Sequence, residues 1–422
     1  MKVGIGIRNI TPEIGETTLS GWGSRGSKLT EGKYDDLKVK SMAFSSRDRR
    51  GLIVTLDLLG LNRDLDDKVR ERLVSRFKLS PEDILITSSH THSGPPSGYI
   101  DTPILNWKPE GNYSEFLTDA VEESCVEAFE DLETCELYMG SGSCNISINR
   151  RKIIDGNTYM LPNEEGTRDN EVIAVKVERK DGSIKAILFH YACHPTTVYS
   201  YNITADYPGE AKKVIERDMG GDVTAIFLQG CCGNVRPRLI EGEKFRSGTI
   251  EDSRRFGEEL GGEVIRICES NPVKIVPRLF TAWKEVGLSF AGRPSQEELK
   301  KKSESGNDRE RKWAQVILSY GDKVPTANPF RIHRFDLAEE LSLIGLEGEV
   351  CVEYQLAIKK LLETTLNLTV GYSNGCIGYI PTAQIIGEGG YEANSVRDWG
   401  APAVYSTEIE KTLISEVRKL VE

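Results

Sequence analysis

Strand-like and helix-like patterns alternate along almost the whole of this 422-residue chain. Residues 84–87 and 223–228 are short apolar runs beside turn signals, which is typical of buried strands. Residues 64–77 instead place apolar side chains four positions apart and charged side chains between them, as an amphipathic helix does. This alternation predicts an α/β fold, or an intimately mixed α+β fold, in which layered mixed β-sheets are covered by helices.

Turn chemistry marks the limits of further elements. Asp181-Gly182 joins two strand-like runs, 172–177 and 184–191, into a predicted strand pair. Further helices are expected over residues 113–132, 208–219, 250–268, 350–364 and 407–421. No internal repeat and no linker is visible, so residues 1–422 are expected to form one large domain. The charged segment near 294–328 is predicted to be an exposed helical excursion from that domain.

The balance of charge excludes some classes of partner. The chain has 65 acidic and 54 basic side chains, which gives a formal net charge of −11. An acidic chain is poorly suited to coat nucleic acid or to adsorb to anionic membranes. No window approaches the ~18 uninterrupted apolar residues of a membrane-spanning helix. We therefore expect a small-molecule substrate as the partner, no nucleic acid and no membrane span; a homo-oligomer stays open.

The first residues and the cysteines both give an indication of the cellular compartment of the protein. The N-terminal residues 1–7 run directly into a strand-like pattern and lack the apolar core of a secretory signal peptide. The nine cysteines are an odd number, are scattered along the chain and include no Cys-x-x-Cys pair. This usage favours reduced thiols over a disulfide framework, so a cytoplasmic location is expected.

Four of the five histidines lie in two short motifs at the ends of predicted strands. The motifs are His90-Thr91-His92 and the run 190–194, which ends in His194. Alternate residues at a strand end point to the same side, so His90 and His92 can face one cleft. Histidine is both a metal ligand and an acid or base near neutral pH. Structural histidines remain an alternative for these motifs, and a structural or solvated role is expected for the isolated His333.

A zinc site needs three or four nitrogen, oxygen or sulfur ligands, and a catalytic one keeps a position open for water. Two histidine motifs can supply imidazoles, but the missing carboxylate could come from any of 65 acidic residues. Composition and spacing alone do not select it.

Several motifs occur together in an order that resembles the neutral/alkaline non-lysosomal ceramidase family. They are Leu-Ser-Gly-Trp-Gly at 19–23, Thr-Ser-Ser-His-Thr-His-Ser-Gly-Pro at 87–95, Ile-Asn-Arg at 148–150, Ala-Cys-His-Pro at 192–195, Leu-Glu-Gly-Glu at 346–349, Gly-Tyr-Ile-Pro-Thr at 378–382 and Tyr-Glu at 391–392. The resemblance runs from near the N-terminus to about residue 397. It implies the catalytic domain of a zinc-dependent amide hydrolase.

The resemblance also implies roles for individual residues. The zinc ligands would be His90, His194, Glu349 and Tyr379. The residues around the scissile amide would be His92, Arg150 and Tyr391, and Gly21 would line the substrate pocket.

This implied set is chemically reasonable. Two imidazoles, a carboxylate and a phenol oxygen suit zinc, which lowers the pKa of bound water toward ~7. His92 could pass a proton to the leaving amine, while Arg150 and Tyr391 could donate hydrogen bonds to the developing oxyanion. Two simpler interpretations stay open: Glu349 could begin the helix expected at 350–364, and Tyr379 could be a core aromatic side chain.

The chain also departs from the family pattern. The family's full-length members carry a further β-sandwich domain and usually a signal sequence, and neither is expected here. The segment 229–238 has Arg236 where the family has its catalytic serine, and Arg238 where it has an asparagine. A guanidinium is suited to bind a carboxylate or phosphate through two hydrogen bonds. The alternative is that Arg236 turns away and pairs with a surface acid.

These features together predict a cytoplasmic, zinc-dependent amidohydrolase acting on linear amide bonds. Its expected substrate is a small, anionic molecule other than a sphingolipid, bound in part by Gly21, Arg236 and Arg238. Two alternatives remain: a true ceramidase, and a metal-binding but catalytically silent ligand-binding protein.

Overall fold

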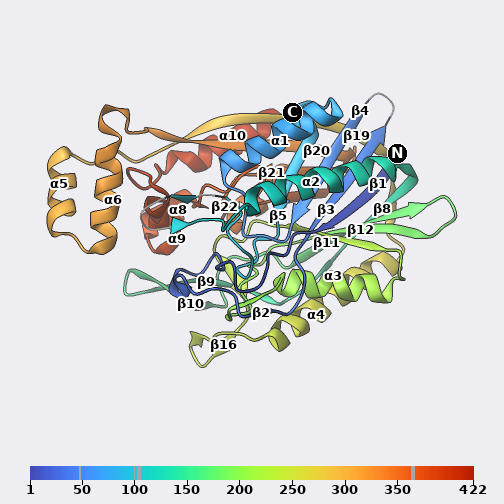
Figure 1. Cartoon of the computed structure of the whole chain (residues 1–422), viewed down its shortest axis with the longest axis horizontal. Helices are drawn as coiled ribbons and strands as arrows, with labels where there is room; N and C mark the ends of the chain where they lie inside the picture. The colour runs from blue at the N-terminus through green and yellow to red at the C-terminus, as the bar shows by residue number, and fades with distance from the viewer. Residues whose placement is uncertain (47–48, 99, 102–105, 363–365) are drawn as a thin grey trace.

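The computed structural model describes residues 1–46, 49–98, 100–101, 106–362 and 366–422. Its centre is a nine-stranded mixed sheet (Figure 1). In spatial order its strands are β14 (Thr224–Gln229), β12 (Ile184–Tyr191), β11 (Glu171–Arg179), β8 (Glu133–Ser143), β1 (Lys2–Asn9), β3 (Lys38–Ser46), β4 (Arg49–Leu56) and β5 (Ile84–Ser88), and β18 (Val273–Ile275) pairs with β8. The pairs β12–β14 and β4–β5 are parallel, and the other neighbours are antiparallel.

A second, four-stranded sheet packs against one face of the large sheet. Its strands are β19 (Pro277–Ser289), β20 (Ala327–Ala338), β21 (Leu341–Leu346) and β23 (Leu366–Val370). Between the two sheets lies a continuous apolar core to which both contribute, for example Met42, Phe44 and Leu188 from the large sheet and Phe335 and Leu343 from the small one. The Phe44 and Phe335 rings meet across this interface with centroids 5.9 Å apart.

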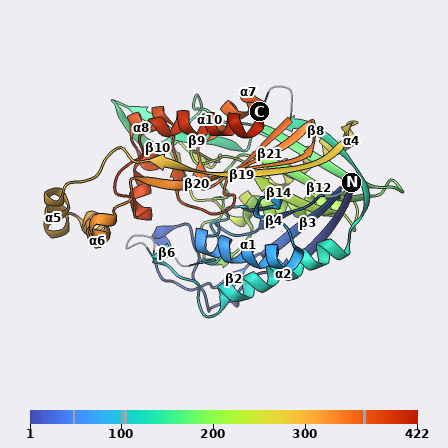
Figure 2. The same ribbon diagram turned by 90° about the horizontal axis from the view of Figure 1, so that it is seen from above.

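Helices cover the two outer faces, which makes four layers. Helices α1 (Arg63–Phe77) and α2 (Tyr113–Glu130) pack on the β3–β5 part of the large sheet. Helices α3 (Asp206–Asp218) and α4 (Ile250–Glu269) pack on its β11–β14 part. Helices α7 (Val352–Leu361) and α10 (Glu408–Val421) cover the small sheet, on the opposite side of the molecule from α1 and α2 (Figure 2). The prediction of layered mixed sheets covered by helices is confirmed.

The charged segment forms a helical arm that stands off the body of the molecule (Figure 1). It consists of α5 (Gln296–Ser305) and α6 (Asp308–Ser319). Apolar side chains on the facing sides of the two helices, Leu299, Trp313 and Ile317 among them, form a small core of their own. The predicted helical excursion is therefore confirmed.

Two predicted helix boundaries need correction. The helix expected at 208–219 begins two residues earlier, at Asp206. The helix expected at 350–364 begins only at Val352, because Val350 belongs to the short strand β22 (Glu349–Val350). Residues 363–364 of that prediction lie outside the described residues. The helix start predicted at residue 350 was wrong because β22 pairs with a distant segment, and this pairing overrides the local helical pattern.

The large sheet curls so that its two edges approach each other. Strands β5 and β14 are its edge strands, yet they contact one another. The chain that leaves β23 helps to join them, since Ser373 forms a bridge to Thr87 of β5 and Val370 forms one to Gly230, just after β14. The loops that follow β5, β12 and β14 are thereby brought to one place.

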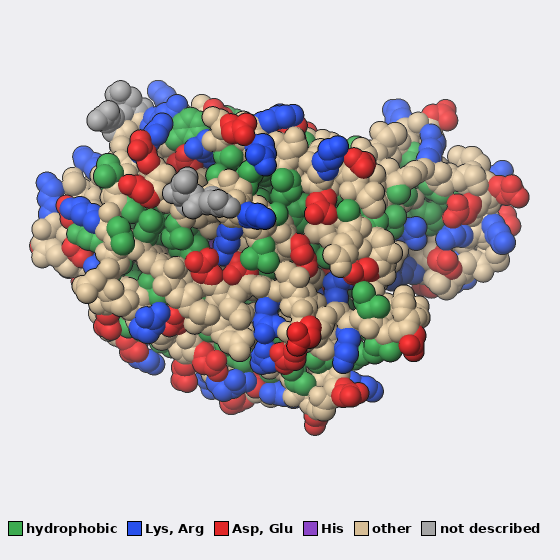
Figure 3. Space-filling view, turned by 180° about the vertical axis from the view of Figure 1, so that it is seen from behind, with side chains coloured by type: hydrophobic (Ala, Val, Ile, Leu, Met, Phe, Trp, Pro, Cys, Tyr) green, Lys and Arg blue, Asp and Glu red, His purple; other side chains and the backbone are tan. Residues whose placement is uncertain are grey.

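Charged side chains of both signs are interspersed over the face seen in Figure 3, and the arm is visible at one end of it. Among the described residues, no helix has the length and apolar character needed to cross a membrane.

Candidate active site

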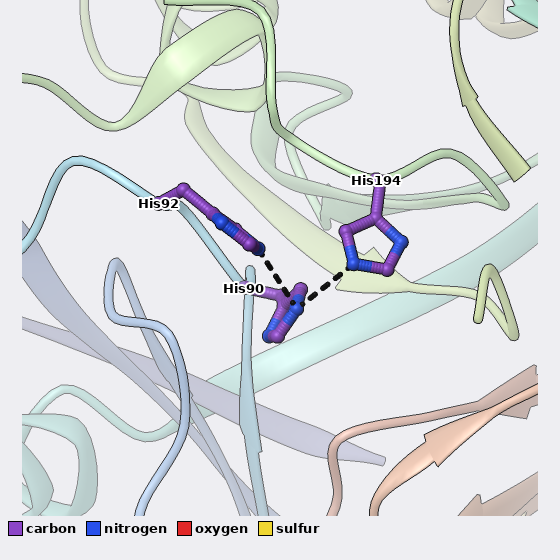
Figure 4. A group of neighbouring side chains, drawn as sticks. All are labelled: His90, His92 and His194. Carbon is purple, nitrogen blue, oxygen red and sulfur yellow. Dashed lines mark hydrogen bonds between the residues drawn. The ribbon is translucent and has the colours of Figure 1, made fainter. Parts of the chain in front are cut away.

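Three imidazoles converge where the edges of the large sheet meet (Figure 4). The Nε2 atom of His90 lies 3.1 Å from Nε2 of His194 and 3.2 Å from Nε2 of His92. All three side chains are buried. His90 and His92 face one site as expected, but not for the expected reason: they lie in the loop after β5, and His90 has a φ of 67°. The left-handed turn at His90, rather than strand alternation, aims the two rings.

Backbone carbonyl groups orient two of these rings. Nδ1 of His90 lies 2.6 Å from the carbonyl oxygen of Leu59, and Nδ1 of His194 lies 2.7 Å from that of Cys232. A carbonyl oxygen can only accept a hydrogen bond, so each Nδ1 carries the proton. In the neutral tautomer the lone pair of each Nε2 atom then points into the shared site, which is the arrangement that metal-binding histidines show.

Glu349 and Tyr379 reach the same site from a short two-stranded ladder. Glu349 in β22 pairs in parallel register with Tyr379 in β24 (Tyr379–Ile380). Oε2 of Glu349 lies 3.3 Å from Nε2 of both His90 and His194. The Tyr379 ring stacks on His194 with centroids 6.4 Å apart and an angle of 12°. Glu349 is thus a strand residue within the site, and the alternative that it merely begins a helix is wrong.

Burial sets the charge of these groups. Burial is the main cause that lowers the pKa of His194 to about 4, and the like charge of His90 lowers this pKa further. Burial and the neighbouring His90 and His194 hold the pKa of His92 well below its usual value. Burial alone would raise the pKa of Glu349, whereas positive charge on a protonated His90 or His194 beside it lowers that pKa well below its ordinary range. At neutral pH the site therefore offers the unprotonated imidazoles of His92 and His194 beside the Glu349 carboxylate.

This donor set fits a metal ion. Potential ligand atoms of His90, His92 and His194 all lie within 4.8 Å of one another. Among the described residues no group donates a hydrogen bond to the buried Oε2 of Glu349, which leaves it available as a ligand. Imidazole nitrogens and a carboxylate oxygen suit zinc, although they also accept other divalent transition metals. The structure brings His90, His194 and Glu349 together, adds His92 as a third imidazole and places the Tyr379 ring against His194.

Arg150 lies beside the metal-binding candidates on β9 (Ser147–Ile154). Its Nε donates a hydrogen bond of 2.8 Å to Glu392, while its buried Nη2 has no hydrogen-bond partner in the described part of the chain. The guanidinium lies over the rings of Tyr379 and Tyr391, 5.4 and 5.6 Å from their centroids. Tyr391, in α9 (Tyr391–Asn394), is half-exposed. Arg150 therefore presents a free donor to the site, and Tyr391 stands at its edge.

Gly21 lies directly against His92. Its φ is 90°, and a Cβ atom added there would lie 2.4 Å from Nδ1 of His92. The neighbouring Trp22 contacts the His92 ring edge-on, with centroids 5.6 Å apart. The structure thus places Gly21 at the site as expected and shows that its lack of a side chain makes room for His92.

Two contributors were missed by the sequence analysis. The Tyr372 ring stacks on His90 with centroids 4.0 Å apart, and its hydroxyl lies 3.1 Å from Sγ of Cys232. Glu392 bridges Arg150 and Arg151 with both of its carboxylate oxygens. The polar, glycine-flanked run 371–375 after a strand was a signal that could have indicated Tyr372.

The remaining histidines have structural roles. His190 lies in β12, where its Nε2 is 2.9 Å from the carbonyl oxygen of Thr369. His333 is buried between the carbonyl group of Glu82 and the side chain of Asn374. Neither belongs to the three-histidine cluster, and the structural role expected for His333 is confirmed.

The two arginines after β14 differ in their surroundings. Arg238 forms an ion pair of 2.5 Å with Glu164, whose side chain is 52% exposed. Arg236, in β15 (Val235–Pro237), is buried and lies against the ring of Phe245. Arg238 thus forms the ion pair with a surface acid that was the alternative for Arg236.

Known proteins resemble this chain in both sequence and fold. Residues 1–253 match the sequence model of the family "Neutral/alkaline non-lysosomal ceramidase, N-terminal". The neutral ceramidase of Mycobacterium tuberculosis is 24% identical over 477 residues, which cover 94% of this chain and 74% of that protein. Neutral ceramidase A of Dictyostelium discoideum is 23% identical over 259 residues, covering 56% of this chain and 36% of that protein.

Solved structures share the fold of the whole chain. The structure described as "Ceramidase complexed with C2" superposes with a TM-score of 0.78 at 19% identity, covering 99% of this chain and 74% of that one. Neutral ceramidase from Pseudomonas aeruginosa gives a TM-score of 0.76, also at 19% identity, covering 98% of this chain and 73% of that one. The matched segment spans more than half of the chain and includes both histidine motifs, so the chain belongs to the neutral/alkaline non-lysosomal ceramidase family.

Proposed function

We propose that this chain is a zinc-dependent hydrolase that cleaves the N-acyl amide bond of ceramide or of a closely related N-acylated amine. The observation that carries the proposal is the convergence of three imidazole Nε2 atoms and the Glu349 carboxylate beside the unpaired donor of Arg150. Membership of the ceramidase family supports amide-bond hydrolysis as the class of reaction.

His90, His194, Glu349 and Tyr379 are the proposed ligands of the metal ion. A zinc ion bound there would supply the Lewis acidity that activates water and polarises an amide carbonyl group.

The surrounding side chains would act on protons and charge. His92 is unprotonated at neutral pH, so it can accept a proton from the attacking water and pass it to the leaving amine nitrogen. Nη2 of Arg150 can donate to the oxygen that gains negative charge, because its Nε is already held by Glu392. The hydroxyl of Tyr391 is proposed as a second donor; burial and the charge of Glu349 raise its pKa to about 12, so it keeps its proton.

The names of the relatives favour ceramide over the non-sphingolipid substrate expected from the sequence, and the proposal therefore adopts a ceramide-type substrate. We also propose a reducing, cytoplasmic compartment. All nine cysteines are buried and none forms a disulfide, which supports that proposal.

Removal of the metal tests the function directly. We expect the chelated protein to release no fatty acid from short-chain ceramide, and one equivalent of zinc per chain to restore release. Metal content by mass spectrometry and fatty acid by chromatography are the measurements, with manganese and magnesium as comparison ions. Full turnover by chelated protein would exclude metal dependence. A zinc-loaded chain that cleaves neither ceramide nor simpler N-acylated amines would instead be a silent binding protein.

A substitution at Gly21 tests the geometry around His92. Gly21→Ala should lower kcat/KM by about 10²-fold, because the added Cβ would displace the His92 ring from its position. Gly23→Ala is a matched control, since a Cβ at Gly23 would meet nothing within 4 Å. Both variants should bind zinc normally. Equal activity of the two variants would show that the position of His92 does not limit the reaction.

A further inference from the structure

Arg236 directly follows a backbone segment that is hydrogen-bonded to two parts of the site. Strand β15 runs antiparallel to β9, with Arg236 opposite Ile148 in the register. The backbone N–H of His194 donates to the carbonyl group of Val235 over 3.2 Å. The backbone N–H of Arg150 donates to the carbonyl group of Asn234 over 3.0 Å. The strand that carries Arg236 is therefore hydrogen-bonded both to a proposed metal ligand and to the proposed oxyanion donor.

The Arg236 side chain is buried without a counter-charge. The residue is 9% exposed, and its Nε is fully buried with no hydrogen-bond partner. Across the described parts of the chain, no carboxylate pairs with its guanidinium and no acceptor is within hydrogen-bond reach of it. The ring of Phe245, in β17 (Lys244–Phe245), covers one face of the guanidinium, 4.3 Å from Cζ.

The arginines adjacent to Arg236 on β9 and after β15 have carboxylate partners. Arg150 and Arg151 share the Glu392 carboxylate, and Arg238 pairs with Glu164. Arg236 instead has the like charge of Arg150 near it. Burial, followed by the like charge of Arg150, lowers the pKa of Arg236 to about 10. The guanidinium therefore stays charged at neutral pH.

A buried charge with no partner is unfavourable, and an arriving anion would remove that penalty. A guanidinium binds a carboxylate or a phosphate through parallel, charge-assisted hydrogen bonds. We infer that Arg236 forms an anion subsite beside the scissile amide and selects N-acylated substrates that carry a carboxylate or phosphate close to that bond. This inference rests on the proposed amide hydrolysis and specifies its substrate class.

Four short-chain substrates and four proteins test the inference. The substrates are an N-lauroyl amino acid, its methyl ester, a ceramide and the corresponding ceramide phosphate. These substrates distinguish the effects of a carboxylate, a phosphate and a neutral group near the amide bond. The proteins are the native chain, Arg236→Gln, Arg236→Lys and, as the matched control, Arg246→Gln, which removes a nearby arginine that is already paired with Asp252.

The native protein should prefer an anionic substrate to its neutral counterpart by about 10–100-fold in kcat/KM, the usual effect of a charge-assisted hydrogen bond. Arg236→Gln should lose that preference without loss on the neutral substrates. Arg236→Lys should retain part of it, because lysine keeps the charge but not the two-bond geometry. Arg246→Gln should behave like the native protein. No preference in the native protein, or equal losses on anionic and neutral substrates in Arg236→Gln, would overturn the inference.

A binding measurement separates this inference from the proposed function. Laurate and inorganic phosphate are titrated calorimetrically into the zinc-loaded native and Arg236→Gln proteins. Weaker binding to the variant by about 10-fold or more supports the subsite even if no amide is cleaved, in which case the proposed function alone fails. Equal binding to both proteins overturns the subsite. Thermal unfolding checks the variant, which should be no less stable than the native protein because it removes an unpaired buried charge.

Discussion

Replacement of His90 or His194 by alanine is expected to lower the affinity for zinc by orders of magnitude and to abolish amide hydrolysis. Each substitution removes an Nε2 atom that a backbone carbonyl group has oriented toward the site. The fold should persist, because the apolar core between the sheets and the helical layers does not include the site. Zinc content after chelation and reconstitution measures the effect, and circular dichroism checks the fold.

The control for this pair is His190→Gln. His190 lies only four residues from His194, but its ring contacts the carbonyl group of Thr369 and is outside the cluster. This variant should retain one equivalent of zinc. If His90→Ala and His194→Ala also retain a full equivalent, the assignment of the metal ligands is wrong.

Replacement of His92 by alanine should leave zinc bound while turnover falls by roughly 10²–10⁴-fold, the usual contribution of general acid–base catalysis. The expectation assigns His92 to proton transfer, with His90, His194, Glu349 and Tyr379 as ligands. The close approach of His92 Nε2 to His90 Nε2, 3.2 Å, makes a direct role in metal binding the competing interpretation. Measurement of zinc content and turnover on the same preparation separates the two.

Each possible result of that measurement supports one of the two roles of His92. Retained zinc with reduced turnover supports proton transfer, whereas joint loss of zinc and activity would make His92 a ligand. His92→Gln is an informative companion, because glutamine keeps polar atoms in the space beside Gly21 but has no group that titrates near neutral pH. It should show the same defect in turnover as alanine.

Local sequence patterns were sufficient for the layered architecture. Strand and helix periods identified β5, β11, β12 and β14 and the helices that cover them, because each of these elements buries one continuous apolar face. The helical arm was also predictable, since its charged sequence leaves few apolar side chains to bury and these pack within the arm itself.

The histidines of the site were predictable from the sequence, but its carboxylate and its geometry were not. The two histidine motifs marked strand ends, whereas Glu349 could not be chosen among 65 acidic residues without the family resemblance. Its position depends on a parallel pairing with Tyr379, thirty residues further along the chain, which no local pattern reports. Tyr372 was missed for the same reason: its contact with His90 joins segments far apart in the sequence.

The sequence by itself determined the alternation of elements, the acidic balance and the two histidine motifs able to bind a metal. Only the tertiary structure decided which of them meet. Curling of the large sheet brings the loop with His90 against the segment with His194, 104 residues away. The same long-range packing leaves Arg236 buried and unpaired while Arg238 finds a surface partner, because burial and pairing depend on distant neighbours rather than on residue type.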